Sequence, residues 1–178
     1  MASKTTTEST AIMDRRVKTD IGVKDDSRKK LVETLNMRLS DEYVLSTKTR
    51  KFHWNVVGPR FSQLHEFFEE QYEIIDEMID EIAERARQLG GKSLGTLEEF
   101  VRHSTLNEDP GQNSNAQTMI SNLLKDHEAI IRTLRKNADE ADEEYDDMAT
   151  NDFFLEAVQK HEKMAWMLRA HLEGKDVL

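Results

Sequence analysis

The chain has 178 residues, of which 37% are hydrophobic and 34% charged, and it contains no cysteine. This length suits one domain with a tail, and the absence of cysteine excludes disulfides and thiolate metal sites. The net charge of −10, from 35 acidic and 25 basic residues, argues against a general nucleic-acid binder, because phosphate affinity requires a positive surface. The same charge suits a protein that collects cations, and it also suits one that works in concentrated salt.

Residues 1–26 lack a sustained apolar period, and we expect them to form a flexible N-terminal arm before a single domain at 27–178. Residues 1–30 hold eight basic and five acidic residues, so this end is only weakly basic, at +3. The Ser/Thr-rich start does not resemble a signal peptide, and no apolar run is long enough to span a membrane. The sequence therefore predicts the cytoplasm, with association to the nucleoid as the further option.

The first helix is predicted from Ser27, a suitable N-cap, to about Trp54, because apolar residues recur at near-helical spacing from Leu31 onward. Gly58 and Pro59 then break the chain. This break folds the following segment back beside the first helix.

A second helix is predicted from Phe61 to Leu89, where Gly90 and Gly91 end it. Its large apolar residues share one side of the helical wheel, and the other side carries an imidazole and five carboxylates: His65, Glu69, Glu73, Asp76, Asp80 and Glu84. Taken singly, each of these residues is most simply a solvated side chain. As a row, the like charges repel by a few tenths of a kcal/mol per pair, and bound cations would relieve that repulsion.

Residues 92–114 form a long connection in which a short helix is predicted near 94–101, capped by Thr96 with Glu99 three residues later. A third long helix is predicted at about 116–143 and a fourth at about 151–173, with an acidic link between them. Four long helices and one long crossover predict an all-α, ferritin-like four-helix bundle with a short helix in the crossover.

Imidazole and carboxylate ligands without sulfur suit iron, manganese or zinc. The break at 58–59 allows His53 and His65 to approach the same point. Asp80, however, lies fifteen residues after His65, or about 22 Å along one helix at 1.5 Å per residue. Two antiparallel copies of the helix would bring these residues together, so the spacing predicts a metal site shared between subunits. No histidine has a glutamate three residues before it, which argues against a di-iron centre within one chain.

Two segments resemble the Dps family of ferritin-like mini-cages. The first contains His53-Trp54-Asn55-Val56, Gly58-Pro59-x-Phe61 and Leu64-His65-Glu66. The second contains Asp80-Glu81-Ile82-Ala83-Glu84-Arg85 followed by Leu89-Gly90. The likeness covers about residues 30–173. It implies a dodecameric cage built from dimers, which oxidises Fe(II), usually with hydrogen peroxide, and stores Fe(III) as mineral. Such a ferroxidase requires no organic cofactor and protects DNA indirectly from oxidative damage.

The resemblance also implies roles for particular residues. His53 and His65 of one chain and Asp80 and Glu84 of its partner would hold iron at the dimer axis. Glu69 stands where the family has a further carboxylate, often Asp, and Trp54 resembles the tryptophan beside the site. The acidic residues that match those of three-fold pores are Asp147, Asp152 and Glu156. The candidates for mineral nucleation on the inner wall are Glu66, Glu70, Glu73 and Glu77.

Two other functions stay open from the sequence: a structural nucleoid protein that binds DNA, and a metal buffer without redox turnover. Family members that compact DNA often use lysine-rich tails, and this arm is only weakly basic. Direct DNA binding is therefore doubtful, and the four-ligand pattern favours the ferroxidase.

Overall fold

The computed structural model describes residues 12–13, 18–111 and 115–173, and most of the expected arm at 1–26 lies outside this part. The described residues form helices and no strand, as predicted. The helices are α1 (Asp25–Asn55), α2 (Phe61–Gln88), α3 (Leu97–His103), α4 (Ala116–Glu143) and α5 (Met148–Glu173).

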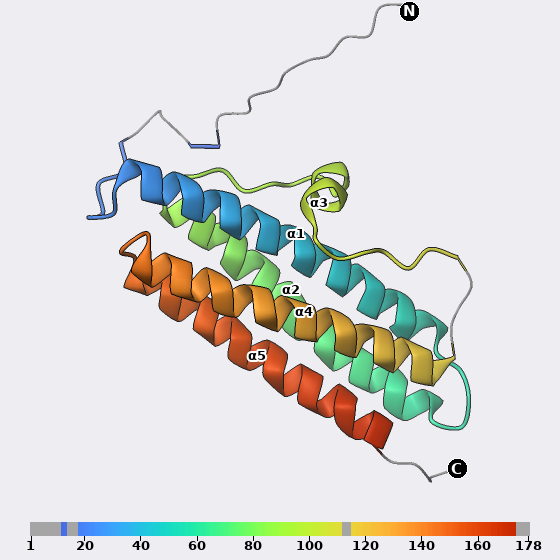
Figure 1. Cartoon of the computed structure of the whole chain (residues 1–178). Coiled ribbons are helices and arrows are strands. Elements are labelled where there is room, and N and C mark those ends of the chain that lie inside the picture. Colours follow the sequence, from blue (N-terminus) through green and yellow to red (C-terminus); the bar gives the residue numbers. More distant parts are fainter. Residues whose placement is uncertain (1–11, 14–17, 112–114, 174–178) are drawn as a thin grey trace, which may run out of the picture.

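The four long helices pair as two antiparallel hairpins, α1 with α2 and α4 with α5, which pack side by side into a bundle (Figure 1). Short α3 lies outside the bundle, in the crossover that runs along α1 from the end of α2 to the start of α4. This arrangement confirms the predicted four-helix bundle and its single crossover. It also places the α1–α2 turn at one end of the molecule.

The core fills the space between the four long helices, as their apolar periodicity requires. Phe52 of α1, Phe68 of α2, Met119 of α4 and Phe154 of α5 are among the largest side chains that are fully buried. Burying a side chain of this size contributes about 1.5–3 kcal/mol. The bundle is thus held by contributions from every long helix.

The crossover covers the outer face of α1, and this explains why α1 buries many polar side chains. Asn36 donates to the carbonyl of Lys92 (2.9 Å) and accepts from the amide of Leu94 (2.9 Å). Further along, Asp41 accepts the amide of Thr105 at 2.6 Å. Side chains of α1 therefore satisfy the backbone of a segment that has little secondary structure of its own.

Two helix starts differ from the sequence-based prediction. Helix α1 begins at Asp25, two residues before the expected cap at Ser27, and acidic residues in its first turn complement the helix dipole. Helix α5 begins at Met148 rather than 151, because Asp147 accepts hydrogen bonds from the backbone amide and hydroxyl of Thr150 (3.2 and 2.6 Å). The expected capping box of Thr96 and Glu99 at α3 is confirmed.

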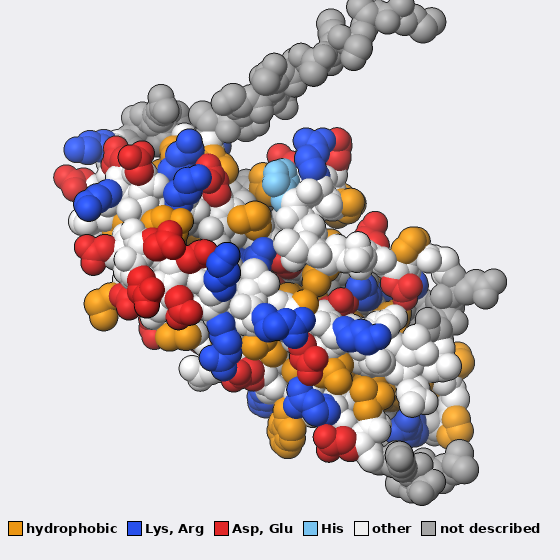
Figure 2. Space-filling model, viewed as in Figure 1, with side chains coloured by type: hydrophobic (Ala, Val, Ile, Leu, Met, Phe, Trp, Pro, Cys, Tyr) orange, Lys and Arg blue, Asp and Glu red, His pale blue; other side chains and the backbone are white. Residues whose placement is uncertain are grey.

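Acidic side chains crowd the end of the molecule where α4 gives way to α5, whereas lysines and arginines are scattered along the middle of the same face (Figure 2). The exposed acids at this end include Asp139, Asp142, Glu143, Glu144 and Asp146. In the part of the chain that the structure describes, no helix combines the length and apolarity that crossing a membrane requires.

Candidate metal centre

His53 closes α1 and His65 lies in the first turns of α2, and the turn between them brings the two imidazoles together. Gly58 adopts a φ of 115° in this turn, a conformation that favours glycine. The rings stack with 3.7 Å between centroids and an interplanar angle of 21°. The predicted approach of the two histidines is therefore confirmed.

Each histidine is held by the backbone of the other. His53 Nδ1 lies 2.8 Å from the carbonyl oxygen of His65, and His65 Nδ1 lies 2.9 Å from the carbonyl oxygen of His53. A carbonyl only accepts, so Nδ1 carries the proton in both rings. In the neutral imidazole this leaves Nε2 with a free lone pair, which is the form that binds a metal ion.

Glu69 and Tyr72 follow His65 on α2, and both are half-buried beside the histidines. The Tyr72 hydroxyl donates to Glu69 Oε1 at 3.1 Å, and the Tyr72 ring meets His53 edge-on with 5.4 Å between centroids. Burial, followed by the hydrogen bond to Glu69, raises the pKa of Tyr72 above its ordinary value. The phenol therefore stays protonated and keeps its role as a donor.

Trp54 directly follows His53 in the sequence, and Phe61 begins α2 four residues before His65. The Trp54 side chain is 68% exposed in the single chain, so it is not part of the core. Phe61 stacks on His65 with 5.1 Å between centroids and is also exposed. Exposed aromatic residues next to a ligand pair favour a surface that a second subunit covers.

Asp80 and Glu84 are exposed on α2, far along the helix from His65. The fifteen residues between His65 and Asp80 correspond to about 22 Å of continuous helix. Within the described ranges, no group of three or more histidine, aspartate or glutamate side chains is arranged to hold a metal ion. The described chain thus presents two histidines at one place and the two carboxylates at another.

An open groove of about 430 Å³ lies around Asp80, between α1 and α2 and beside the crossover. Its lining combines apolar side chains, including Tyr43 and Leu94, with the ion pair of Arg50 and Asp76. The groove leaves the carboxylate of Asp80 accessible. A second polypeptide could reach this carboxylate without displacing the core.

The expected pore residues lie around the start of α5. Asp152 and Glu156 are exposed, and Glu156 pairs with Lys160 at 3.4 Å. Asp147 is instead buried, at 4% exposure, and it caps α5. The four glutamates expected to nucleate mineral are all exposed on α2: Glu66, Glu70, Glu73 and Glu77. The pore and nucleation roles stay predictions.

Three buried polar side chains, one each from α1, α4 and α5, form a hydrogen-bonded row that was not predicted from the sequence. His127 of α4 and His161 of α5 lie 2.9 Å apart through their Nδ1 atoms, and His161 Nε2 lies 3.0 Å from Glu42 Oε1 of α1. Complete burial, followed by the nearby His161, lowers the pKa of His127 well below 6.5. No regular spacing in the sequence links residues this far apart, so no motif could have revealed them.

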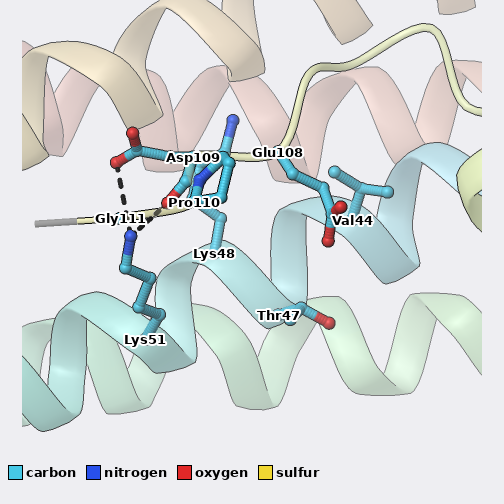
Figure 3. Close-up of a pocket in the computed structure, with 8 residues that line it drawn as sticks. All are labelled: Val44, Thr47, Lys48, Lys51, Glu108, Asp109, Pro110 and Gly111. Carbon is cyan, nitrogen blue, oxygen red and sulfur yellow. Dashed lines mark hydrogen bonds and ion pairs between the residues drawn. The ribbon is translucent and has the colours of Figure 1, made fainter.

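A separate cavity of about 180 Å³ lies between α1 and the crossover (Figure 3). Both lysines that line the cavity form hydrogen bonds within the protein. Lys48 donates to Asp126 and to the carbonyl of Asn107, both at 2.6 Å, and Lys51 donates to the carbonyl of Asp109. The cavity contains none of the predicted ligands, and its cations serve to fasten the crossover.

These features define a ferritin-like bundle in which two histidines meet beside the α1–α2 turn and exposed carboxylates follow along α2, and the comparison with known sequences agrees. A family model described as a ferritin-like domain matches residues 32–176. The chain is 41% identical over 144 residues to DNA protection during starvation protein 2 of Bacillus anthracis, covering 81% of this chain and 97% of the relative. It is 44% identical over 158 residues to an uncharacterised low temperature-induced protein of Nostoc sp., covering 89% and 88%.

Solved structures give the same result. Dps from Bacillus brevis matches with a TM-score of 0.80 and 36% identity over 84% of this chain and 99% of that one. DpsC from Streptomyces coelicolor matches with a TM-score of 0.87 and 28% identity over 91% and 94%. The chain is therefore a ferritin-like protein. Within that class it belongs to the Dps family.

Proposed function

We propose that this protein is an iron-storing ferroxidase whose metal centre is completed only when two subunits meet. His53 and His65 come from one subunit and Asp80 and Glu84 from its partner, and Glu69 supplies a further carboxylate. The observation that carries the proposal is the reciprocal backbone tether of the two histidines, which frees both Nε2 atoms while the described part of the chain offers no complete ligand set.

The ligand chemistry fits Fe(II) as the substrate. Neutral imidazoles and carboxylates hold Fe(II), and a site with so few protein ligands leaves positions open for hydrogen peroxide. Two Fe(II) ions supply the two electrons that break the O–O bond of peroxide. One peroxide and two waters then give two FeOOH units and four protons, so the atoms and charges balance. Because both electrons leave together, less hydroxyl radical escapes, and DNA is protected indirectly.

The assembly proposed is a hollow shell of twelve subunits built from two-fold dimers. The exposed residues Trp54 and Phe61 and the groove around Asp80 are the surfaces that the dimer would cover. Asp152 and Glu156 would draw cations to a three-fold entrance, because converging carboxylates raise the local cation concentration. The exposed glutamates of α2 would then receive Fe(III) inside the shell.

Mixed assembly of two inactive variants tests the shared site. One variant carries His53→Ala and His65→Ala, and the other carries Asp80→Ala and Glu84→Ala. We expect neither to oxidise Fe(II) alone. After dissociation and joint reassembly, each hybrid dimer regains one intact centre, so about a quarter of the wild-type sites return, since half of randomly formed dimers are hybrids.

The matched control is the same dissociation and reassembly of each variant by itself, which should restore nothing. Activity is followed as the growth of Fe(III) absorbance after Fe(II) and hydrogen peroxide are added without oxygen. Full inactivity of the mixed assembly, with hybrids verified by native mass spectrometry, would contradict a centre shared between subunits.

A further inference from the structure

Tyr72 joins both parts of the candidate centre that belong to one subunit. Its hydroxyl donates to Glu69 Oε1 at 3.1 Å, and the edge-on contact between its ring and His53 has an interplanar angle of 82°. Tyr72 follows Glu69 by one helical turn on α2, whereas His53 belongs to α1. The side chain therefore spans the space between a proposed carboxylate ligand and a proposed imidazole ligand.

The face of the Tyr72 ring is also in contact with a side chain of α1. The guanidinium of Arg50 lies over the ring face, 4.4 Å from its centroid, in a cation–π contact. Arg50 forms an ion pair with Asp76, and Asp76 accepts the hydroxyl of Ser46 at 2.7 Å. Arg50 of α1 thus contacts α2 twice, through the Tyr72 ring and through Asp76, and Asp76 is held in turn by α1.

This support matters most for Glu69, which has one more methylene, and one more rotatable bond, than aspartate. A ligand held only by its own backbone would lose more conformational entropy on binding a metal ion. The hydrogen bond from Tyr72 occupies Oε1 and restrains the side chain, whereas among the described residues no hydrogen bond reaches Oε2. Groups that orient ligands in this way typically contribute tenfold to a hundredfold to metal affinity.

We propose that Tyr72 is a positioning residue for the second metal position of the centre: it fixes Glu69 so that its free carboxylate oxygen binds a divalent cation there. The inference rests on the proposed function, because it assigns a role within the same shared site. The longer side chain at position 69 and the tyrosine at position 72 then act as one unit, in which the phenol compensates for the extra methylene.

The test uses Co(II), which is not oxidised under the assay conditions, titrated into the assembled metal-free protein by calorimetry. We expect the wild type to bind two Co(II) ions per centre in two steps. Tyr72→Phe should weaken the second step about tenfold or more and leave the first step unchanged. Tyr145→Phe, which removes a hydroxyl near the end of α4, is the matched control and should change neither step.

Glu69→Gln should lose the second step, and adding Tyr72→Phe to it should change nothing more. Thermal unfolding of the metal-free variants tests whether Tyr72 has only a structural role. In that case Tyr72→Phe would lower the unfolding midpoint and weaken both Co(II)-binding steps equally. That result, or two wild-type steps in Tyr72→Phe, would overturn the inference alone. One Co(II) per centre in the wild type would also overturn it while leaving a shared first position intact. No binding at all would overturn the proposed function and the inference with it.

Discussion

Asp147 and Arg85 form an ion pair, with 3.3 Å between carboxylate and guanidinium, that ties the start of α5 to the end of α2. The same carboxylate accepts two hydrogen bonds from Thr150, and Thr150 Oγ1 accepts from Arg85 as well, at 2.8 Å. Asp147 is therefore fully engaged within its own subunit. The family resemblance implies that Asp147 lines a pore; within its own subunit its carboxylate caps α5 and pairs with Arg85, and the pore role stays a prediction.

Replacing Asp147 with alanine should destabilise the fold. The change removes the N-cap of α5 and leaves Arg85 without its partly buried partner, so we expect the free energy of unfolding to fall by about 1–3 kcal/mol. The measurement is chemical denaturation monitored by circular dichroism. Asp152→Ala is the control, because its exposed side chain should change stability by about 0.5 kcal/mol at most. Equal midpoints for Asp147→Ala and the wild type would contradict the structural role.

The same pair of variants separates stability from iron entry. If Asp152 lines an entrance, Asp152→Ala slows Fe(II) uptake at low ionic strength, and the difference shrinks as salt screens the field. Initial rates at two salt concentrations measure this. An uptake rate that is independent of both the substitution and the salt would remove Asp152 from the pathway.

The positions of His53 and His65 could be predicted because the signal is local. A Gly-Pro break between two amphipathic helical segments allows few arrangements of the two helices. The antiparallel hairpin is the arrangement that buries the apolar faces of both. The separation of Asp80 from the histidines is equally local, because the rise of a helix is fixed. These two facts together carried the prediction of a shared site.

Other features depend on tertiary packing and had no local signal. Tyr72 reads as one aromatic residue in an amphipathic helix, and its contact with His53 depends on how α1 and α2 pack. Glu42, His127 and His161 come from three helices, and their meeting requires the whole bundle. The sequence predicts the start of α5 three residues too late, because an acidic segment is also typical of a solvated loop. The structure shows that Asp147 in this segment is buried and caps the helix.

The buried His127 makes the stability of the fold dependent on pH. Its folded-state pKa lies well below 6.5, so between that value and 6.5 the unfolded chain binds a proton that the folded chain does not. Stability should therefore be complete above about 6.5 and should decline as the pH falls below it. The decline from one such group is at most about 1.4 kcal/mol per pH unit.

Thermal unfolding between pH 5 and 8 checks this dependence. His127→Gln should flatten the acid side of the curve, whatever its effect at pH 8, because it removes the titrating group. Burial and the charge of Arg60 also lower the pKa of His171, so part of the slope should remain. His103→Gln, at an exposed helix end, serves as the control. An unchanged slope in His127→Gln would show that its titration does not contribute.

Gly91 lies where α1 and the start of the crossover approach each other closely. A Cβ atom at this position would collide with both methyl groups of Val32 and would lie 3.0 Å from the carbonyl oxygen of Ala86. Gly91→Ala should therefore lower the free energy of unfolding by about 1–3 kcal/mol through overpacking. Gly95→Ala is the control, because nothing lies within 4 Å of its added Cβ.

Denaturation midpoints of both variants test the prediction. The collision can be assigned to Val32 by a double-mutant cycle, in which Val32→Ala should cost less in the Gly91→Ala background than in the wild type. Independent, additive effects would show that the crossover moves away rather than pressing on α1.

The charge distribution predicts weak binding to DNA, although several relatives are named for DNA protection. The chain has a net charge of −10, and on the face shown in Figure 2 basic side chains are interspersed with acidic ones. Several basic residues of the chain are already paired with acids, as in Arg135 with Glu162 (2.5 Å) and Arg169 with Glu128 (2.9 Å). Binding to phosphates depends on the release of counterions and weakens as salt rises, so a chain with ten more acidic than basic residues should bind duplex DNA poorly at physiological salt.

A mobility-shift titration with the assembled protein should accordingly show no retention of duplex DNA at physiological ionic strength. The positive control replaces four exposed acids at or just after the end of α4 with lysine: Asp139, Asp142, Glu143 and Glu144. This variant raises the formal charge from −10 by eight units, to −2, and should retain DNA in low salt where the wild type does not. Tight binding by the wild type at physiological salt would contradict the prediction and would favour the nucleoid role over indirect protection through iron removal.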